Sequence, residues 1–293
     1  MLAQSAAAPF DSPAHLFEIK WDGTRCVAFV ESGHVRLQNR RFVELRERYP
    51  ELGCLAALPS GTVLDTEIVV LAGGKPSFNK LAQRDHLTDA QQIAMAAQRL
   101  PATMMAFDLL YLRGEPLLAR PLTERKARLR ELLPGMAPHV LASDHVIEQG
   151  VAYFRAAEQH GLEGVMAKRL DSPYLPGKRT AHWTKVKVAR VEDFDVIGYT
   201  KRDGADVISA LLLAERRGRS WVFKGNVGSG FTEWQRAELF QRLSPAPPLP
   251  APPKDGPAGA LWRATGLRCT VQYFEKTVHG RLRGPVYKGL ASP

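Results

Sequence analysis

Short segments rich in β-branched and aromatic residues, separated by turns that contain glycine, run through most of this chain and favour a fold built on β-sheets. Residues 17–38 predict a strand, a tight turn at Asp22-Gly23, a second strand and a hairpin at Ser32-Gly33. Further strands are predicted at TVLDTEIVVL, MMAFDLLYL, GLEGVMAKRL and HWTKVKVARVEDFDVIGYT. Helices are predicted at LTDAQQIAMAAQRL, with Thr88 or Asp89 as its N-cap, and at the amphipathic LTERKARLRELL. This alternation predicts an α+β domain over residues 1–189.

The sequence changes in character after residue 190. The short predicted strands FDVIGYT, ALLLAE, SWVFKGNVG and CTVQYFEK follow one another with turns between them. They predict a small β-barrel domain over residues 190–293. The segment SPAPPLPAPPKDGPAG can enter neither a helix nor the interior of a sheet, so we expect an exposed, semi-rigid loop there.

The balance of charge is basic, and it is most basic in the second domain. The chain has 40 Lys plus Arg and 30 Asp plus Glu, a net +10, and residues 190–293 hold 16 of the basic and 10 of the acidic residues. This favours a polyanionic partner, because neutralising phosphates releases condensed counterions. Many basic proteins bind no nucleic acid, so charge alone leaves the partner open.

The compartment is indicated by what the sequence lacks. The segment MLAQSAAAPFDSP has neither the basic nor the apolar region of a signal peptide, and no stretch approaches the length of a transmembrane helix. Cys26, Cys54 and Cys269 are scattered and odd in number, which suits reduced thiols. We therefore expect a cytoplasmic protein that does not contact a membrane.

The segment from Lys20 to Arg25, KWDGTR, is the first that could carry chemistry. A lysine with an ordinary pKa of about 10.4 is a poor nucleophile at neutral pH. It becomes a useful one when a site desolvates it or surrounds it with positive charge. The turn at Asp22-Gly23 can fold Arg25 back toward Lys20, so that one residue attacks a phosphorus atom while the other holds an oxygen. The alternative is an ordinary surface turn.

Acidic residues on two predicted strands suggest a metal site. Asp65 and Glu67 share one face of their strand, and Glu163 precedes Lys168 on another. Carboxylates from two strands can hold Mg²⁺ or Mn²⁺ and leave positions for water and phosphate. The alternative is a set of salt bridges at strand ends.

A pair of lysines suggests a site for phosphates. Lys185 and Lys187 are two residues apart on a predicted strand, so both side chains lie on one face. Such a face could clamp a triphosphate. The alternative is a solvated strand face.

Taken in order, these elements resemble the covalent nucleotidyltransferase superfamily of DNA ligases, RNA ligases and mRNA capping enzymes. The residues Lys20, Asp22, Gly23 and Arg25 are similar to its nucleotidyl-lysine motif, and the four motifs that follow match Glu67, Phe107, Glu163 and the pair Lys185 and Lys187. Five elements in the same order make a chance match far less probable than one. The resemblance spans roughly residues 15–290.

Segments outside the motifs point to bacterial ATP-dependent DNA ligases, including the ligase module of end-joining enzymes. They are VRLQNRRFVELRERYPEL, FKGNVGSGFT and RLRGPVYKGL. The resemblance implies a nucleotidyltransferase (adenylation) domain over residues 1–189 and an OB-fold domain over residues 190–293. It also implies ATP and a divalent metal as cofactors, nicked duplex DNA as substrate, a monomer, and a place at the bacterial nucleoid.

The resemblance also assigns roles to residues. The catalytic residues that it implies are Lys20, Asp22, Arg25 and Lys187. The nucleotide-binding residues that it implies are Glu18, Ile19, Lys20, Arg25, Arg40, Glu67, Phe107, Val165, Lys185 and Lys187. The metal ligands are Glu67 and Glu163, and the DNA-binding residues are Arg281, Arg283 and Lys288.

Base recognition is expected from a few of these side chains. Glu18 would read the adenine amino group, and Phe107 would stack on adenine with Val165 or Met166 against the other face. Packing in the core is an equal alternative for Phe107, since aromatic residues fill cores routinely. Arg25 and Arg40 would orient ribose and phosphate.

The sequence departs from the family at three places. Phe42 stands where glycine is expected, and Thr66 stands where glycine is common. The Arg-X-Asp-Lys signature near the C-terminus of many relatives has no literal match, and Arg281, Arg283 and Lys288 are the residues that could replace it.

The reaction implied by the resemblance has three steps. Lys20 takes AMP from ATP, AMP passes to the 5′-phosphate of a nick, and the 3′-hydroxyl displaces it. A mobile OB-fold domain with a hinge at 188–193 would enclose the nick. The alternatives are an RNA ligase, a capping-type nucleotidyltransferase, and a non-catalytic OB-type nucleic-acid binding protein.

Overall fold

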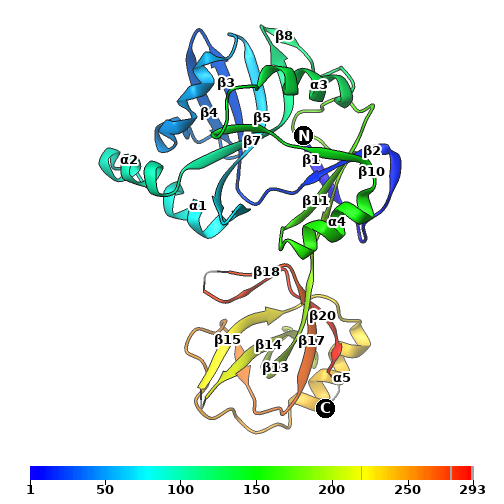
Figure 1. The fold of residues 1–293 in the computed structure, drawn as a ribbon. Helices are drawn as coiled ribbons and strands as arrows, with labels where there is room; N and C mark the ends of the chain where they lie inside the picture. The colour runs from blue at the N-terminus through cyan, green and yellow to red at the C-terminus, as the bar shows by residue number, and fades with distance from the viewer. Residues whose placement is uncertain (219, 278, 292–293) are drawn as a thin grey trace. The chain divides into compact units, whose positions relative to one another are not determined.

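The computed structural model describes residues 1–218, 220–277 and 279–291. Two compact units make up the chain: an N-terminal unit, Met1–Val188, and a C-terminal unit, Ala189–Pro293 (Figure 1). The N-terminal unit contains two sheets and the helices that cover them, and the C-terminal unit is mostly strand. This is the α+β nucleotidyltransferase and OB-fold pairing that the sequence predicts.

The strands of the N-terminal unit form a five-stranded and a seven-stranded sheet. The five-stranded sheet has the order β1 (Leu2–Ser5), β12 (Arg179–Lys187), β11 (Gly164–Arg169), β2 (Ser12–Ile19), β10 (His145–Glu148). The seven-stranded sheet has the order β4 (His34–Asn39), β3 (Thr24–Glu31), β5 (Thr62–Ala72), β7 (Ala102–Leu112), β8 (Glu115–Pro116), with β6 (Lys75–Pro76) beside β5 and β9 (Val140–Ala142) beside β7.

The helices of this unit lie between the strands in sequence. They are the 3-10 helices η1 (Arg46–Arg48) and η2 (Pro50–Ala57) and the α-helices α1 (Phe78–Asp85), α2 (Ala90–Arg99), α3 (Leu122–Leu132) and α4 (Gly150–Gln159). Within the described ranges, no helix of the chain is both long enough and apolar enough to cross a membrane.

The C-terminal unit is a curled six-stranded sheet with one helix and a separate two-stranded ribbon. The sheet has the order β15 (Ser220–Val227), β14 (Ile208–Arg217), β13 (Arg190–Lys201), β17 (Arg268–Tyr273), β20 (Val286–Leu290), with β16 (Ala260–Trp262) beside β13. The ribbon pairs β18 (Glu275–Lys276) with β19 (Leu282–Arg283), and the helix is α5 (Glu233–Leu243). The proline-rich segment before β16 forms no helix or strand, although Leu249 within it is buried in the core.

Local signals in the sequence account for several of these elements. Glu31 and His34 face each other across a two-residue loop, in which Ser32 and Gly33 both have positive φ, so β3 and β4 form the predicted hairpin. Asp89 caps α2 by accepting a hydrogen bond from the backbone of Gln92 (2.9 Å). Both predictions are confirmed.

Several elements were not predicted, among them β1, α4 and α5. Strand β1 is four residues long and is held by parallel pairing with β12, more than 170 residues away in sequence. Helix α4 packs on the five-stranded sheet, and α5 starts with a capping box made by Thr232 and Gln235. The capping box is a local signal that is present in the sequence. The pairing of β1 with β12 has no such local signal.

Strand alternation decides which residues face which layer. Cys26, Ala28 and Leu64 belong to a core that also includes residues of η2, α1 and α3, so this face of the seven-stranded sheet is covered by helices. Residues of the other parity, such as Phe107, pack with Trp183 of the five-stranded sheet. The two sheets of the N-terminal unit therefore face each other through Phe107 and its neighbours.

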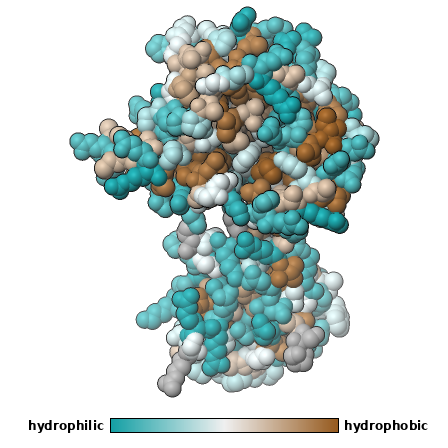
Figure 2. Space-filling view, viewed as in Figure 1, coloured by the Kyte–Doolittle hydropathy of each residue, from teal (hydrophilic) through white to brown (hydrophobic). Residues whose placement is uncertain are grey.

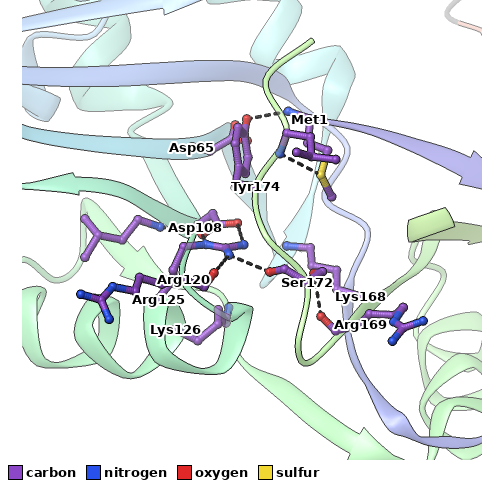
Figure 3. Close-up of polar contacts among 12 residues, drawn as sticks. Met1, Asp65, Asp108, Arg120, Arg125, Lys126, Lys168, Arg169, Ser172 and Tyr174 are labelled. Carbon is purple, nitrogen blue, oxygen red and sulfur yellow. Dashed lines mark hydrogen bonds and ion pairs between the residues drawn. The ribbon is translucent and has the colours of Figure 1, made fainter. Parts of the chain in front are cut away.

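Helix α3 links the two sheets through two consecutive buried cations (Figure 3). Arg125 forms a bidentate ion pair with Asp108 on β7 (2.7 and 2.9 Å) and donates to the carbonyl oxygens of Arg120 and Ser172. Lys126 Nζ lies 2.6 Å from Glu18 Oε1 on β2. One turn of helix thus holds a carboxylate from each sheet. The sequence predicted the helix, but not that its inner face carries charges.

Replacing Arg125 with methionine should lower the free energy of unfolding by about 3–5 kcal/mol, because Asp108 would remain buried without its partner. Urea unfolding followed by circular dichroism measures the change. Arg128→Met is the matched control, since Arg128 pairs with Glu124 on the partly exposed face of the same helix. That variant should lose less than about 1 kcal/mol, and equal losses in the two variants would contradict the role assigned to Arg125.

Candidate active site

A cavity of about 280 Å³ lies between the two sheets of the N-terminal unit. Of the residues predicted from sequence, those that line it are Glu18, Ile19, Lys20, Arg25, Arg40, Glu67, Phe107 and Lys185. The alternation of the strands brings them together: Arg25, Glu67 and Phe107 point inward from the seven-stranded sheet, and Glu18 and Lys185 from the five-stranded sheet.

Lys20 directly follows β2, and its side chain is held by the carboxylate of Glu163, the residue before β11. Its backbone N–H donates to the carbonyl of Gly164 (2.9 Å), and its Nζ donates to Glu163 Oε2. The other oxygen of Glu163 lies 2.7 Å from Lys187 Nζ. Burial alone would raise the pKa of Glu163, but the ammonium groups of Lys20 and Lys187 hold it below its usual range. Three of the predicted motifs thus meet at one ionised carboxylate.

Two glycines next to these residues permit close approach of neighbouring strands. A Cβ atom on Gly23 would lie 2.1 Å from the carbonyl oxygen of Ile68, so no other residue fits in the turn after Lys20. Gly164 has φ of 140° and would place its Cβ 2.1 Å from the carbonyl oxygen of Val186. Close contact with the neighbouring backbone therefore explains why glycine follows Asp22 and Glu163 in the sequence.

Arg25 is fixed by a buried acceptor rather than left free in the cavity. Its Nε and Nη2 donate to Asp65 (3.0 and 2.6 Å), and Tyr174 Oη donates to the same carboxylate (2.7 Å). Burial would lower the pKa of Arg25, but Asp65 raises it above its ordinary value, so the guanidinium stays charged. Asp22 lies in the turn and is not among the residues that line the cavity.

Glu67 is a buried carboxyl group in the cavity wall whose pKa is strongly raised. Burial, together with the nearby charges of Asp65 and Glu163, raises its pKa to about 8 against the opposing effect of Lys20 and Arg25. A carboxyl in this state would gain from a divalent cation nearby.

The carboxylates of Glu67 and Glu163 are the donor set available to a metal. No group of three or more His, Cys, Asp or Glu side chains in the described residues could hold an ion by itself. Mg²⁺ commonly takes one or two protein carboxylates and fills its shell with water and phosphate oxygens. The two residues fit an ion of that kind, which would take its other ligands from a bound nucleotide.

One nucleotide contact expected from the sequence, Val165, does not face the cavity. Val165 is fully buried on the other face of β11, where it packs with Ala157 and Val186, and it does not line the cavity. Met166, the next residue along the strand, lines it instead. Assigning Val165 to the nucleotide was wrong, because alternate residues of a strand face opposite sides. Met166, its stated alternative, has the right parity.

Phe107 packs in the core and also faces the cavity. It is 9% exposed and meets Trp183 edge to face with ring centroids 5.9 Å apart, which places it in the core. It also lines the cavity, as Trp183 does.

The wall contains cations that the sequence did not single out as nucleotide contacts. Arg179 lines the cavity with Lys185, whereas Lys168 lines it where its Nζ pairs with Glu18. Burial lowers the pKa of Lys185, and the charges of Lys187, Lys20 and Arg179 lower it further. Repulsion of this kind is relieved by an anion, so this part of the wall suits a polyphosphate.

The loop after Arg40 explains why glycine is expected at position 42. Arg40 lines the cavity, and Phe42 two residues later has φ of 62° with its side chain 81% exposed. Asn39 Oδ1 accepts hydrogen bonds from the backbone of Arg41 and Val43 (2.8 and 3.0 Å), which holds the loop in this shape. Thr66, the other departure, is buried and donates its hydroxyl to the carbonyl of Cys26.

The three residues predicted to contact DNA lie in the C-terminal unit and have different surroundings. Arg283 and Lys288 are exposed on β19 and β20. Arg281 is paired with Asp255, and its guanidinium lies 4.3 Å from the centroid of the Phe223 ring. Hydrophilic residues dominate the visible surface of this unit, whereas apolar residues form several patches on the N-terminal unit (Figure 2).

Fold and site together define a covalent nucleotidyltransferase domain joined to an OB-fold domain. Residues 1–187 match the family model described as the ATP-dependent DNA ligase domain, and residues 204–292 match the ATP-dependent DNA ligase C-terminal region. The chain belongs to the ATP-dependent DNA ligase family. This result favours DNA ligase over the RNA ligase, capping and non-catalytic alternatives.

Similar proteins include enzymes much longer than this chain. The chain is 33% identical, over 94% of its length, to the multifunctional non-homologous end joining DNA repair protein LigD of Mycobacterium tuberculosis, and it spans 36% of that protein. It is 34% identical to the SPbeta prophage-derived DNA ligase-like protein LigB of Bacillus subtilis, with 98% of this chain and 97% of that one covered. The crystal structure of the ligase domain of M. tuberculosis LigD has 31% identity and a TM-score of 0.58, with 99% and 94% of the two chains covered.

The raised pKa of Glu67 predicts a specific pH dependence of stability without divalent metal. Between pH 4.5, the ordinary carboxyl value, and about 8, the folded protein retains a proton that the unfolded chain has lost. The contribution of Glu67 to the free energy of unfolding therefore falls as pH rises through this range.

Glu67→Gln removes this titration, so its stability relative to the wild type should increase steadily from pH 5 to 8. Urea unfolding of both proteins in EDTA at several pH values measures the difference. A difference that does not change with pH would contradict the perturbed state of Glu67.

Proposed function

We propose that this chain is an ATP-dependent DNA ligase that forms a lysyl-AMP intermediate on Lys20 and seals nicks in duplex DNA. The observation that carries the proposal is the meeting of Lys20, Glu163 and Lys187 at the edge of a cavity lined by further cations. Membership of the ATP-dependent DNA ligase family supports ATP as the nucleotide and DNA as the substrate.

In the first step Lys20 attacks the α-phosphorus of ATP. The amine attacks in its neutral form, so the ion pair with Glu163 is a resting arrangement. One proton passes from Nζ to the Glu163 carboxylate before the attack, and a second is lost to water as the N–P bond forms. The bond from the α-phosphorus to the bridging oxygen breaks, and pyrophosphate leaves opposite the amine. Lys185 and Lys187 neutralise the negative charge on the phosphate oxygens as pyrophosphate leaves.

The remaining nucleotide contacts follow from the cavity wall. Arg25, held by Asp65, and Arg40 orient the ribose and α-phosphate, while Phe107 and Met166 enclose the base. Glu67 and Glu163 would hold Mg²⁺ or Mn²⁺, which would supply charge neutralisation at the phosphates when bound.

The second and third steps use DNA. AMP moves from Lys20 to the 5′-phosphate of a nick, and the 3′-hydroxyl then attacks that phosphorus and expels AMP. Residues 1–189 form the adenylation domain, and residues 190–293 form the OB-fold domain that binds the phosphate backbone through Arg281, Arg283 and Lys288. We propose that the protein acts as a monomer in the bacterial cytoplasm, near the nucleoid.

Lys20→Ala should abolish the covalent adduct formed from α-labelled ATP and divalent metal, because the proposal makes the Lys20 amine the nucleophile. Denaturing electrophoresis after incubation measures the adduct. Binding to a nicked duplex should persist and weaken with added salt, as phosphate contacts require. An adduct of wild-type yield in this variant would show that the nucleophile is another residue.

Reversing the charge of Arg283 should reduce sealing of a nick while leaving adduct formation from ATP near the wild-type level. The reason is that Arg283 is exposed on the C-terminal unit, whereas the nucleotide cavity lies wholly in the N-terminal unit. Arg281→Glu should act in the same direction. Arg242→Glu, on the exposed side of α5, is the control. Equal sealing by all four proteins would remove Arg281 and Arg283 from the DNA-binding surface.

A further inference from the structure

The inner wall of the cavity contains a carboxylate with both oxygens in ion pairs. Glu18 is 1% exposed and lines the cavity from β2. Its Oε1 lies 2.6 Å from Lys126 Nζ, and its Oε2 accepts from Lys168 Nζ at 2.8 Å. Lys126 comes from α3 and Lys168 from β11, so two separate elements hold one side chain.

Both lysines are themselves fixed in place. Lys168 is 1% exposed, and its Nζ lies 4.5 Å from the ring centroid of Phe107 and 4.3 Å from that of Trp183. Cation–π attraction adds to the ion pair there. Lys126 is buried and also donates to the carbonyl oxygen of Ser143 (2.8 Å). Neither ammonium can leave Glu18 without breaking a second contact.

The two purine nucleotides differ at the group that a carboxylate in this position would meet. Adenine presents an amino group, a donor, where guanine presents the O6 oxygen, an acceptor. An ionised carboxylate only accepts hydrogen bonds, so it bonds the adenine amino group and repels O6. A protonated carboxyl can donate, and could serve guanine. The charge state of Glu18 therefore decides which base the wall favours.

We propose that Lys126 and Lys168 are positioning residues that keep Glu18 a hydrogen-bond acceptor and thereby set the preference for ATP over GTP. The inference rests on the proposed function and on the expectation from the sequence that Glu18, which lines the cavity, meets the adenine amino group. It assigns a substrate-selecting role to two lysines that do not act in the transfer of AMP.

The electrostatics of the surroundings support this inference. Burial by itself would raise the pKa of Glu18, and the charges of Lys126 and Lys168 outweigh burial and lower it below its usual range. The other titratable groups facing Glu18 are His145 on β10 and Tyr153 on α4. The pKa of His145 is lowered to about 4, chiefly by burial, so His145 stays neutral above pH 5.5.

The test compares adduct formation from α-labelled ATP and α-labelled GTP, as kcat/KM for each, in full-length variants. The substitutions are Lys168→Met, Lys126→Met and Glu18→Gln, with Lys168→Arg as the charge-conserving variant and Lys75→Met, an exposed lysine on β6, as the control. Dividing kcat/KM for ATP by kcat/KM for GTP cancels any loss of activity that affects both nucleotides equally. Thermal unfolding of each variant establishes that it is folded.

We expect the ATP-to-GTP ratio to fall by about ten- to a hundredfold in Lys168→Met, Lys126→Met and Glu18→Gln, the range of one good base-reading contact. Lys168→Arg and the control should keep the wild-type ratio. In the two methionine variants the fall should be larger at pH 6 than at pH 8, because a carboxyl without its cation gains a proton as pH falls.

Wild-type ratios in folded methionine variants would overturn the inference while leaving the proposed function intact. If these variants do not fold, the wild-type protein still tests the inference. Its ATP-to-GTP ratio of kcat/KM should stay constant from pH 5.5 to 8. A ratio that falls on acidification would show that Glu18 is not held ionised. A wild-type protein that forms no adduct with either nucleotide would instead overturn the proposed function itself.

Discussion

Ion pairing of buried carboxylates is the constraint on which the N-terminal unit depends. Glu18, Asp65 and Asp108 are almost wholly inaccessible to solvent, and an isolated buried charge costs several kcal/mol. Each is matched by cations from other elements: Glu18 by two lysines, Asp65 by Arg25, and Asp108 by Arg125. Asp65 and Asp108 are directly paired on β5 and β7, and their arginines reach them from two different elements, β3 and α3. These requirements fix how β2, β3, α3 and β11 are placed around the cavity.

The same pairings divide the cavity into two chemically different parts. One part contains Glu18 with its two paired lysines and the aromatic rings of Phe107 and Trp183, which suits a base. The other contains Lys20, Lys185 and Arg179, which suits phosphates. Glu163 stands at the second part with a lysine on each oxygen, and this arrangement explains how the amine is kept in place before nucleotide binds. The proposed nucleotide orientation follows from this division rather than from any single contact.

Much of this arrangement could be predicted from the sequence, because strand alternation is a local rule. The positions of Glu67, Phe107 and Lys185 on inward faces follow from the parity of their strands, and the same rule selects Met166 over Val165. The hairpin at Ser32-Gly33 and the cap at Asp89 are also local. Membership of the family was visible in the order of the motifs.

Contacts between distant segments could not be predicted in this way. The pairing of Lys126 with Glu18 joins residues more than 100 positions apart in the sequence. Lys126 also belongs to a helix with many charged residues, a pattern that predicts exposure of those residues to solvent. Strand β1 likewise gains its partner only when β12 is in place. A charged residue in a helical pattern gives no local sign of whether it meets water or a buried carboxylate. That information comes from packing.

The central claim, that Lys20 is the residue which carries AMP, is tested most directly by mapping the adduct. The protein would be incubated with ATP and Mg²⁺, digested at a pH that preserves a phosphoramide bond, and analysed by tandem mass spectrometry. We expect one added AMP on the peptide that contains Lys20, and we expect it to be removed when nicked duplex DNA is supplied. AMP on Lys168, Lys185 or Lys187 instead, or an adduct that nicked DNA does not discharge, would contradict it.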